Sequence, residues 1–141
     1  EGGIATPMIV RWPTQIAPNT VSSQVCHIID LMPTFLEVAQ SAYPTQYRGR
    51  PIIPCEGVSL TPIFSGQSLP GSRVLWWEYR GSRAVREGPW KLVRDRKRPD
   101  WELYHMGHDR TETNDLAKQY PEKVTQMAKS WQGWHTRMES P

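Results

Sequence analysis

The feature that most constrains the fold is a run of four strand-like segments between residues 73 and 104. They are Arg73 to Tyr79, Ser82 to Arg86, Pro89 to Arg94 and Trp101 to Tyr104. The first two breaks between them are Arg80-Gly81 and Glu87-Gly88, and short breaks that contain glycine are typical of β-hairpins. We therefore predict an antiparallel meander of four strands.

The last part of the chain has a helical pattern. Pro121 is suited to the first turn of a helix, and the apolar residues after it recur every three or four positions, which marks one helical face. These residues are Val124, Met127, Ala128, Trp131, Trp134 and Met138. We predict that this stripe packs across one face of the meander, which gives an α+β fold.

The first 72 residues are less regular. Pro7 to Trp12 is a short apolar run that resembles a strand buried on both faces of a larger sheet. Because proline is tolerated only in the first turn of a helix, Pro33 places Asp30 as a cap and a helix from about Leu31 to Gln40. Residues 41–72 are rich in proline and glycine, and we interpret them as a long loop around a short apolar turn at Leu60 to Phe64.

The composition excludes several classes. Hydrophobic residues make up 38% of the chain and charged residues 22%, so a folded domain is expected. The net charge of +3 is too small to indicate a nucleic-acid-binding protein. No apolar run approaches the roughly 20 residues that span a bilayer, so no membrane partner is expected. Cys26 and Cys55 have neither zinc-site nor disulfide-scaffold spacing, which favours two thiols.

Few residues suggest chemistry. His105, His108 and Asp109 are close enough in sequence to suggest metal ligands, but they stand in a predicted turn, and a solvated turn is the favoured interpretation. The charged residues 95–100, at a predicted hairpin tip, could contact phosphate or sulfate, but a solvated tip is the favoured interpretation. Cys26 and His27 are adjacent on an extended segment and would point to opposite faces, which disfavours a nucleophile–base pair. Core packing is favoured over a sugar-binding surface for Trp76, Trp77, Trp90 and Trp101.

Several stretches resemble, in the same order, those of sulfatases of the alkaline-phosphatase-like superfamily. Glu1-Gly2-Gly3-Ile4 and the strand Pro7 to Pro13 resemble that family's Glu-Gly-Gly stretch and following strand. Asp30 to Leu36 resembles its Asp-x-x-Pro-Thr helix start, and Gly57-Val58-Ser59-Leu60 its Gly-x-Ser-Leu turn. The C-terminal sheet is matched by Trp77-Glu78-Tyr79, Arg83 to Arg86, Gly88 to Val93, Glu102 to Tyr104 and Glu112 to Ala117. The chain departs from the pattern at Ala5, where an Arg is common, and at Tyr79, where a His is common.

The resemblance implies that the parent enzyme is a sulfatase, a sulfuric ester hydrolase, that uses calcium and a formylglycine made from a cysteine. That cysteine belongs to a Cys-x-Pro-x-Arg or Cys-x-Ala-x-Arg motif, which neither Cys26 nor Cys55 matches. The calcium ligands and an active-site lysine are expected upstream of Glu1. The resemblance thus implies no catalytic residue and no metal ligand within this segment.

We therefore predict a C-terminal sulfatase segment that supports the fold, edges the substrate cleft and is inactive alone. Residues 1–40 would end the catalytic α/β domain, 41–72 form a long loop and 73–141 form the C-terminal subdomain. We predict Glu78, Tyr79 and Arg80 as substrate-side residues. The alternatives are the same region of a phosphonate monoester or phosphodiester hydrolase, or a free-standing carbohydrate-binding module.

The expected partners are the upstream catalytic domain of the same chain and a sulfated small molecule or glycan. The isolated segment is expected to self-associate, because a strand without its sheet exposes an apolar edge. No targeting signal is present in these residues. The resemblance alone implies an exported parent, periplasmic or secreted.

Overall fold

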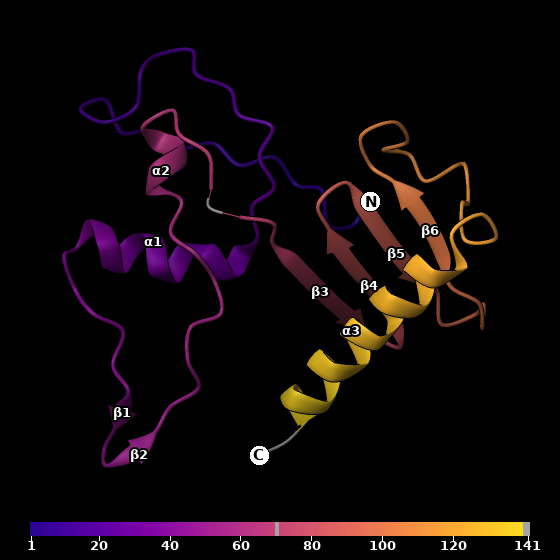
Figure 1. The fold of residues 1–141 in the computed structure, drawn as a ribbon. Helices are drawn as coiled ribbons and strands as arrows, with labels where there is room; N and C mark the ends of the chain where they lie inside the picture. The colour runs from indigo at the N-terminus through magenta and orange to yellow at the C-terminus, as the bar shows by residue number, and fades with distance from the viewer. Residues whose placement is uncertain (70, 140–141) are drawn as a thin grey trace. The chain divides into compact units, whose positions relative to one another are not determined.

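The computed structural model describes residues 1–69 and 71–139, and the chain divides into two units (Figure 1). One unit combines Glu1–Pro7 with Ser72–Pro141 and is called the sheet–helix unit below. The other, Met8–Gly71, is called the helix–hairpin unit. The predicted domain boundaries remain a prediction, since they concern a parent enzyme.

The sheet–helix unit contains the predicted meander. Its four strands are antiparallel and lie in the order β3-β4-β5-β6. They are β3 (Val74–Tyr79), β4 (Ser82–Glu87), β5 (Trp90–Arg94) and β6 (Glu102–His105). Each begins or ends within one residue of its prediction. The α+β fold class is therefore confirmed.

Helix α3 (Pro121–Glu139) covers one face of this sheet (Figure 1). Val85, Leu92 and Leu103 are cross-strand partners on β4, β5 and β6, so their side chains share that face. They are fully buried and form one core cluster with Met127 and Trp131 of α3. The predicted packing of the helix on the meander is thus confirmed. It also confirms core packing for three of the tryptophans, because Trp76, Trp90 and Trp101 pack against the cluster.

The helix–hairpin unit contains short elements. A 3₁₀ turn, η1 (Ile28–Asp30), leads into α1 (Leu31–Val38), and α2 (Thr61–Phe64) follows later in the chain. Between the two helices, β1 (Gln46–Tyr47) and β2 (Arg50–Pro51) form a two-stranded hairpin. Pro33 lies in the first turn of α1, where a missing N–H breaks no helical hydrogen bond.

Polar side chains fix the segment before α2 against α1. The carboxylate of Asp30, fully buried, accepts hydrogen bonds from the backbone N–H of His27 at 2.7 Å and of Val58 at 3.0 Å. Thr34 Oγ1 accepts the N–H of Leu60 at 2.9 Å. A Cβ on Gly57 would lie 2.1 Å from the carbonyl oxygen of Ile29, so only glycine fits there. The Asp-x-x-Pro-Thr and Gly-x-Ser-Leu stretches, far apart in sequence, therefore contact each other in the fold.

Two predictions for the first 72 residues differ from the structure. Residues 7–12 form no strand in the described chain. A single extended segment cannot form a ladder, and the sheet it was expected to join is not part of this chain. Residues 41–72 are not wholly irregular, because they contain β1, β2 and α2.

Candidate functional site

Two of the three predicted substrate-side residues lie at the tip of the β3–β4 hairpin. Tyr79 pairs with Ser82, which leaves Arg80 and Gly81 as a two-residue turn. Both turn residues have positive φ, 50° and 85°, as a type I′ turn requires. The Tyr79 side chain is 69% exposed, and the guanidinium carbon of Arg80 lies 5.2 Å from the centre of its ring. The tip therefore presents a cation stacked on an exposed aromatic ring.

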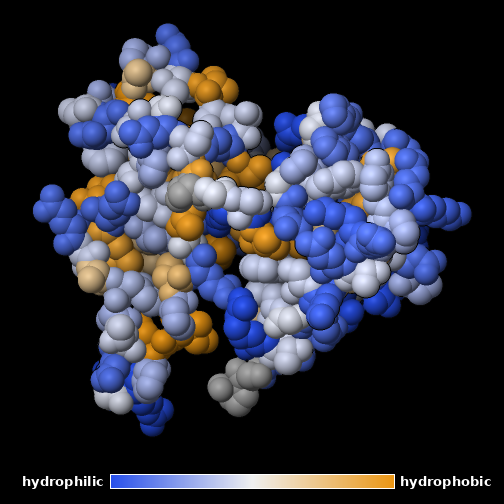
Figure 2. Space-filling model, in the orientation of Figure 1, coloured by the Kyte–Doolittle hydropathy of each residue, from blue (hydrophilic) through white to orange (hydrophobic). Residues whose placement is uncertain are grey.

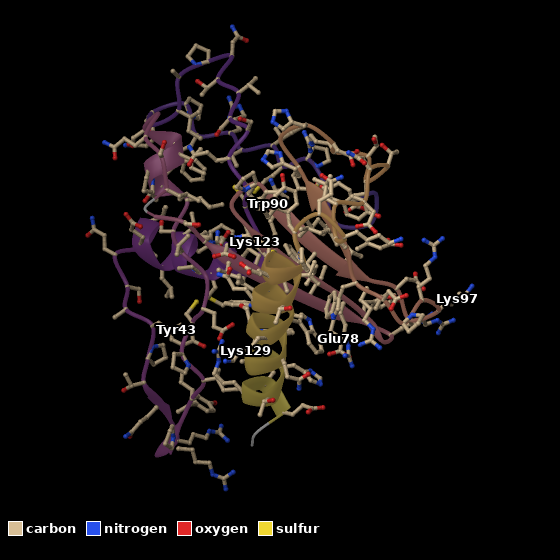
Figure 3. The ribbon with its side chains drawn as sticks, turned by 45° about the vertical axis from the view of Figure 1, so that its right-hand side comes forward. Tyr43, Glu78, Trp90, Lys97, Lys123 and Lys129 are labelled. Atoms are coloured by element: carbon tan, nitrogen blue, oxygen red, sulfur yellow. The ribbon has the colours of Figure 1, made fainter. Side chains whose placement is uncertain are left out.

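Glu78, the third predicted residue, contacts helix α3, and its substrate-side role stays a prediction. Its Oε2 lies 3.0 Å from Nδ1 of His135, and Figure 3 shows Glu78 beside α3. The imidazole of His135 in turn stacks on Trp131, with ring centres 4.6 Å apart. Glu78 therefore links β3 to the helix, and its carboxylate is engaged within the unit.

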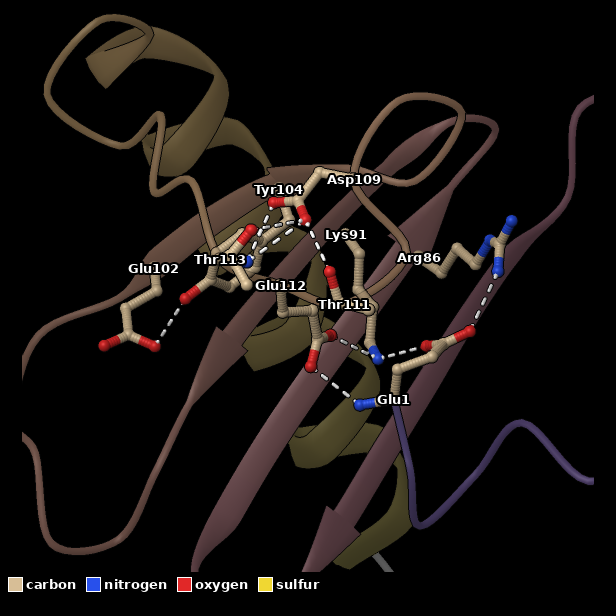
Figure 4. A network of polar contacts seen from close by, with 9 residues as sticks. All are labelled: Glu1, Arg86, Lys91, Glu102, Tyr104, Asp109, Thr111, Glu112 and Thr113. Carbon is tan, nitrogen blue, oxygen red and sulfur yellow. Dashed lines mark hydrogen bonds and ion pairs between the residues drawn. The ribbon is translucent and has the colours of Figure 1, made fainter.

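The second polar feature lies on the sheet face opposite α3. Arg86, Lys91 and Tyr104 are cross-strand partners, and they alternate with the core residues along β4, β5 and β6. The Lys91 side chain is only 2% exposed, and its Nζ lies 2.6 Å from Glu1 Oε2 and 2.6 Å from Glu112 Oε1 (Figure 4). A buried ammonium is costly unless it is paired, so the two carboxylates are what make this position tolerable.

Further charges complete this Lys91 network, defined by Glu1, Lys91 and Glu112. The amino nitrogen of Glu1 lies 2.7 Å from Glu112 Oε2, and Arg86 Nη1 lies 3.9 Å from Glu1 Oε1. Burial opposes ionisation of Glu112, but hydrogen bonds from Lys91 and the Glu1 amino group outweigh it and hold its pKa below the ordinary value. The network joins the start of the chain to the far face of the sheet.

Asp109 fixes the loop that carries Glu112. Its carboxylate accepts hydrogen bonds from the backbone N–H of Asn114 at 2.9 Å and of Thr113 at 3.0 Å (Figure 4). These bonds favour the ionised form and lower the pKa of Asp109. Asp109 thus positions Glu112 over the sheet.

The other candidate groups do not form a catalytic or metal site in the described residues. The rings of His105 and His108 stack with centres 4.6 Å apart. No three His, Cys, Asp or Glu side chains gather where they could hold a metal ion, within residues 1–69 and 71–139. The His, Cys, Asp and Glu side chains of these residues therefore do not fit a calcium site. Cys26 and Cys55 are not joined in a disulfide. None of the described helices has the length and apolarity that crossing a membrane requires.

Sequence reasoning missed the Lys91 network because its members are far apart in the chain. Glu1 and Lys91 are separated by 90 positions, and Glu1 and Glu112 by 111. A signal was nevertheless present: both glutamates belong to stretches that resemble the sulfatase pattern. A lysine predicted at the middle of a buried strand is a further sign that carboxylates must lie opposite it.

Comparison with known families gives a match over most of the chain. Residues 1–136 match the family described as N-sulphoglucosamine sulphohydrolase, C-terminal. A sulfatase of Schizosaccharomyces pombe is 30% identical over 142 residues, which cover 93% of this chain and 25% of that protein. The chain thus spans about a quarter of the length of the first curated relatives that it matches.

Solved structures show the same fold. The crystal structure of Ps i-CgsB aligns with a TM-score of 0.70 and 22% identity, covering 87% of this chain and 27% of that one. BT4656 in complex with its substrate, D-glucosamine-2-N,6-O-disulfate, aligns with a TM-score of 0.65 and 21% identity. That alignment covers 94% of this chain and 29% of the other.

Proposed function

Because this chain belongs to the sulfatases, as a C-terminal domain of the N-sulphoglucosamine sulphohydrolase type, we propose that its parent enzyme hydrolyses sulfate esters. In that enzyme the segment completes the fold and edges the substrate cleft. The observation that carries this proposal is the family match over residues 1–136. The calcium ion and the formylglycine that the family resemblance implies would belong to residues of the parent upstream of this segment.

The substrate that we propose is a sulfated sugar. One relative of the same fold was solved with a disulfated glucosamine as its substrate. The tip formed by Tyr79 and Arg80 suits such a ligand, since a guanidinium forms two parallel hydrogen bonds with an oxyanion and an aromatic ring packs against a sugar face. We therefore keep Tyr79 and Arg80 as substrate-side residues, and give Glu78 a positioning role through His135.

The decisive experiment compares the parent enzyme with this chain on an aryl sulfate and on the matching aryl phosphodiester. We expect the parent to hydrolyse the sulfate ester and this chain to hydrolyse neither. Preferential turnover of the phosphodiester by the parent would overturn the proposal in favour of a phosphoester hydrolase. Turnover by this chain alone would show that it contains a catalytic site.

The role of the tip is tested in the parent with Arg80→Asn, because asparagine keeps the positive-φ turn. We expect kcat/KM on a sulfated disaccharide to fall roughly tenfold, the loss of one charge-assisted contact. Lys118→Asn, at an exposed position outside the hairpin tips, is the control and should change kcat/KM little. Equal activity of both variants would exclude Arg80 from the substrate side.

We also propose that the upstream catalytic domain covers apolar side chains of the helix–hairpin unit. Ile9, Ile28 and Phe35 are 94%, 76% and 64% exposed, and Figure 2 shows apolar atoms on the surface of this unit. Patches of this kind mark interfaces. The isolated chain should therefore self-associate in sedimentation velocity, and Phe35→Gln should weaken this more than Val21→Gln. A strictly monomeric chain at every concentration would contradict the proposal.

A further inference from the structure

The tripeptide Tyr-Arg-Gly occurs at the tips of two hairpins. The first is Tyr47-Arg48-Gly49 between β1 and β2, and the second is Tyr79-Arg80-Gly81 between β3 and β4. The two turn residues have φ of 50° and 77° at the first tip, against 50° and 85° at the second. The arginine covers the preceding tyrosine in both, with the guanidinium carbon 5.3 Å and 5.2 Å from the ring centre. The same exposed cation–aromatic unit is therefore built twice.

The first tip carries one more cation than the second. In the β1–β2 ladder Tyr47 pairs with Arg50, so these two side chains leave the same face of the hairpin. In the β3–β4 ladder the partner of Tyr79 is Ser82, a neutral residue. The Tyr47 ring, 63% exposed, thus has Arg48 stacked on it and Arg50 directly across the ladder. Figure 2 shows strongly hydrophilic atoms at this end of the hairpin.

No carboxylate balances these cations locally. Residues 41–55 contain neither Asp nor Glu. Among the ion pairs of the described residues, none involves Arg48 or Arg50, whereas Arg98 on the β5–β6 turn pairs with Glu102 at 2.9 Å. That turn also contains Asp95 and Asp100. Of these two basic turns, only the β1–β2 hairpin has no acidic neighbour in sequence.

We infer that the β1–β2 hairpin is a second binding site for sulfated sugar, separate from the Tyr79–Arg80 tip. Arg48 and Arg50 would bind sulfate oxygens, and the Tyr47 ring would pack against the sugar. The choice of a sulfated sugar as the ligand rests on the proposed function. Two cations and one ring suit a sugar unit with one or two sulfates, whereas nucleic-acid binding uses an extended basic surface.

The test uses this chain and a heparin hexasaccharide, with the desulfated and N-acetylated hexasaccharide as the reference ligand. The variant is Arg48→Asn with Arg50→Thr. Asn-Gly is the preferred type I′ turn and threonine favours strands, so the hairpin should be kept. The matched control, Lys118→Gln with Lys129→Gln, removes the same charge from exposed positions outside both hairpin tips. Circular dichroism checks that all variants are folded.

We expect calorimetry to show binding of the sulfated hexasaccharide only, weakened roughly fivefold to tenfold in the hairpin variant, the size expected for two exposed charge contacts. The control variant should bind within about twofold of the original chain, a difference of roughly 0.4 kcal/mol. Tyr47→Ala should weaken binding, whereas Tyr47→Phe should not, since the ring and not the hydroxyl makes the contact.

Three outcomes would overturn the inference. They are equal losses in the two charge variants, equal binding of the desulfated hexasaccharide, and tighter binding of a DNA duplex than of the sulfated hexasaccharide. Each is distinct from failure of the proposed function, which is measured by aryl sulfate hydrolysis in the parent. A parent without sulfatase activity and a chain whose hairpin still binds the sulfated sugar would refute the first proposal and leave the second standing.

Discussion

In the sheet–helix unit, five buried apolar side chains meet between the sheet and α3. In the helix–hairpin unit, the buried positions among the described residues are Asp30, Thr34 and Leu60, two of them polar. The first unit is therefore stabilised mainly by apolar area removed from water. The second depends on a few directional hydrogen bonds to backbone N–H groups. Loss of a buried apolar side chain should therefore destabilise the first unit most. Loss of a hydrogen-bonding side chain should destabilise the second unit most.

The largest effect is expected from Trp131→Ala in the apolar core. Trp131 is 1% exposed, donates its Nε1–H to the carbonyl of Trp77 at 3.0 Å, and lies under the guanidinium of Arg83. Removing it should cost about 3 to 5 kcal/mol of unfolding free energy. Urea unfolding followed by circular dichroism measures this. Trp134→Ala, at a half-buried position of the same helix, should cost clearly less, and equal losses would contradict a core centred on Trp131.

Asp30→Ala should be the most damaging polar change in the helix–hairpin unit. It leaves the N–H groups of His27 and Val58 without their carboxylate, at a cost of about 3 kcal/mol. Thr34→Val removes the acceptor for the Leu60 N–H and the donor to the Asp30 carbonyl oxygen, and should cost about 1 to 2 kcal/mol.

Amide hydrogen exchange measures the effect of Asp30→Ala on each unit separately. With Asp30→Ala, the amides of Val58 and Leu60 should exchange faster while that of Leu103 in β6 stays protected. Uniform loss of protection in both units would show that they unfold together, which would contradict separate sources of stability for the two units.

Two glycines provide substitutions of opposite sign. Gly57→Ala would place a methyl group 2.1 Å from the Ile29 carbonyl oxygen, so the backbone must shift at a cost of about 1 to 3 kcal/mol. Gly133 lies within α3 with open space around it, and Gly133→Ala should stabilise that unit by about 0.5 to 1 kcal/mol. Thermal unfolding measures both. A neutral Gly57→Ala would mean that Gly57 does not lie against the η1 turn.

The smallest effect is a pH dependence of the sheet–helix unit. The pKa of Glu112 is lower in the folded chain than in the unfolded chain. Its contribution to stability is therefore complete above the unfolded pKa and is lost as the pH falls through the folded pKa. The free energy of unfolding should fall with acid, and Glu112→Gln should flatten this slope. If Glu112→Gln left the pH dependence of the unfolding free energy unchanged, folding would not favour the ionised form of Glu112.

Local signals were enough to predict the four-stranded meander and helix α3. Arg80-Gly81 and Glu87-Gly88 mark turns by themselves, and the spacing of Met127, Trp131 and Trp134 marks one helical face. The β1–β2 hairpin was missed because strands of two residues carry no alternation. Its turn, Arg48-Gly49, has the same two residues as the predicted turn Arg80-Gly81, and this repeat could have indicated a hairpin.

The candidate site was predicted only in part. Tyr79 and Arg80 do form an exposed tip, and their substrate-side role stays a prediction. The engagement of Glu78 with His135 depends on how α3 lies over β3, and the Lys91 network depends on residues more than 80 positions apart. Neither pairing leaves a periodic pattern, so it follows from the tertiary structure alone.

The Lys91 network also has a consequence for the order in which the chain folds during synthesis. Glu1 leaves the ribosome well before Arg86 and Lys91, so its carboxylate finds its partners only after β4 and β5 are made. The intervening Met8–Gly71 unit can form the hydrogen bonds of Asp30 and Thr34 in the meantime, because their partners His27, Val58 and Leu60 lie within it. Closing so long a loop is entropically costly and comes late. Glu1 is thus made before its partners and reaches its native contacts late.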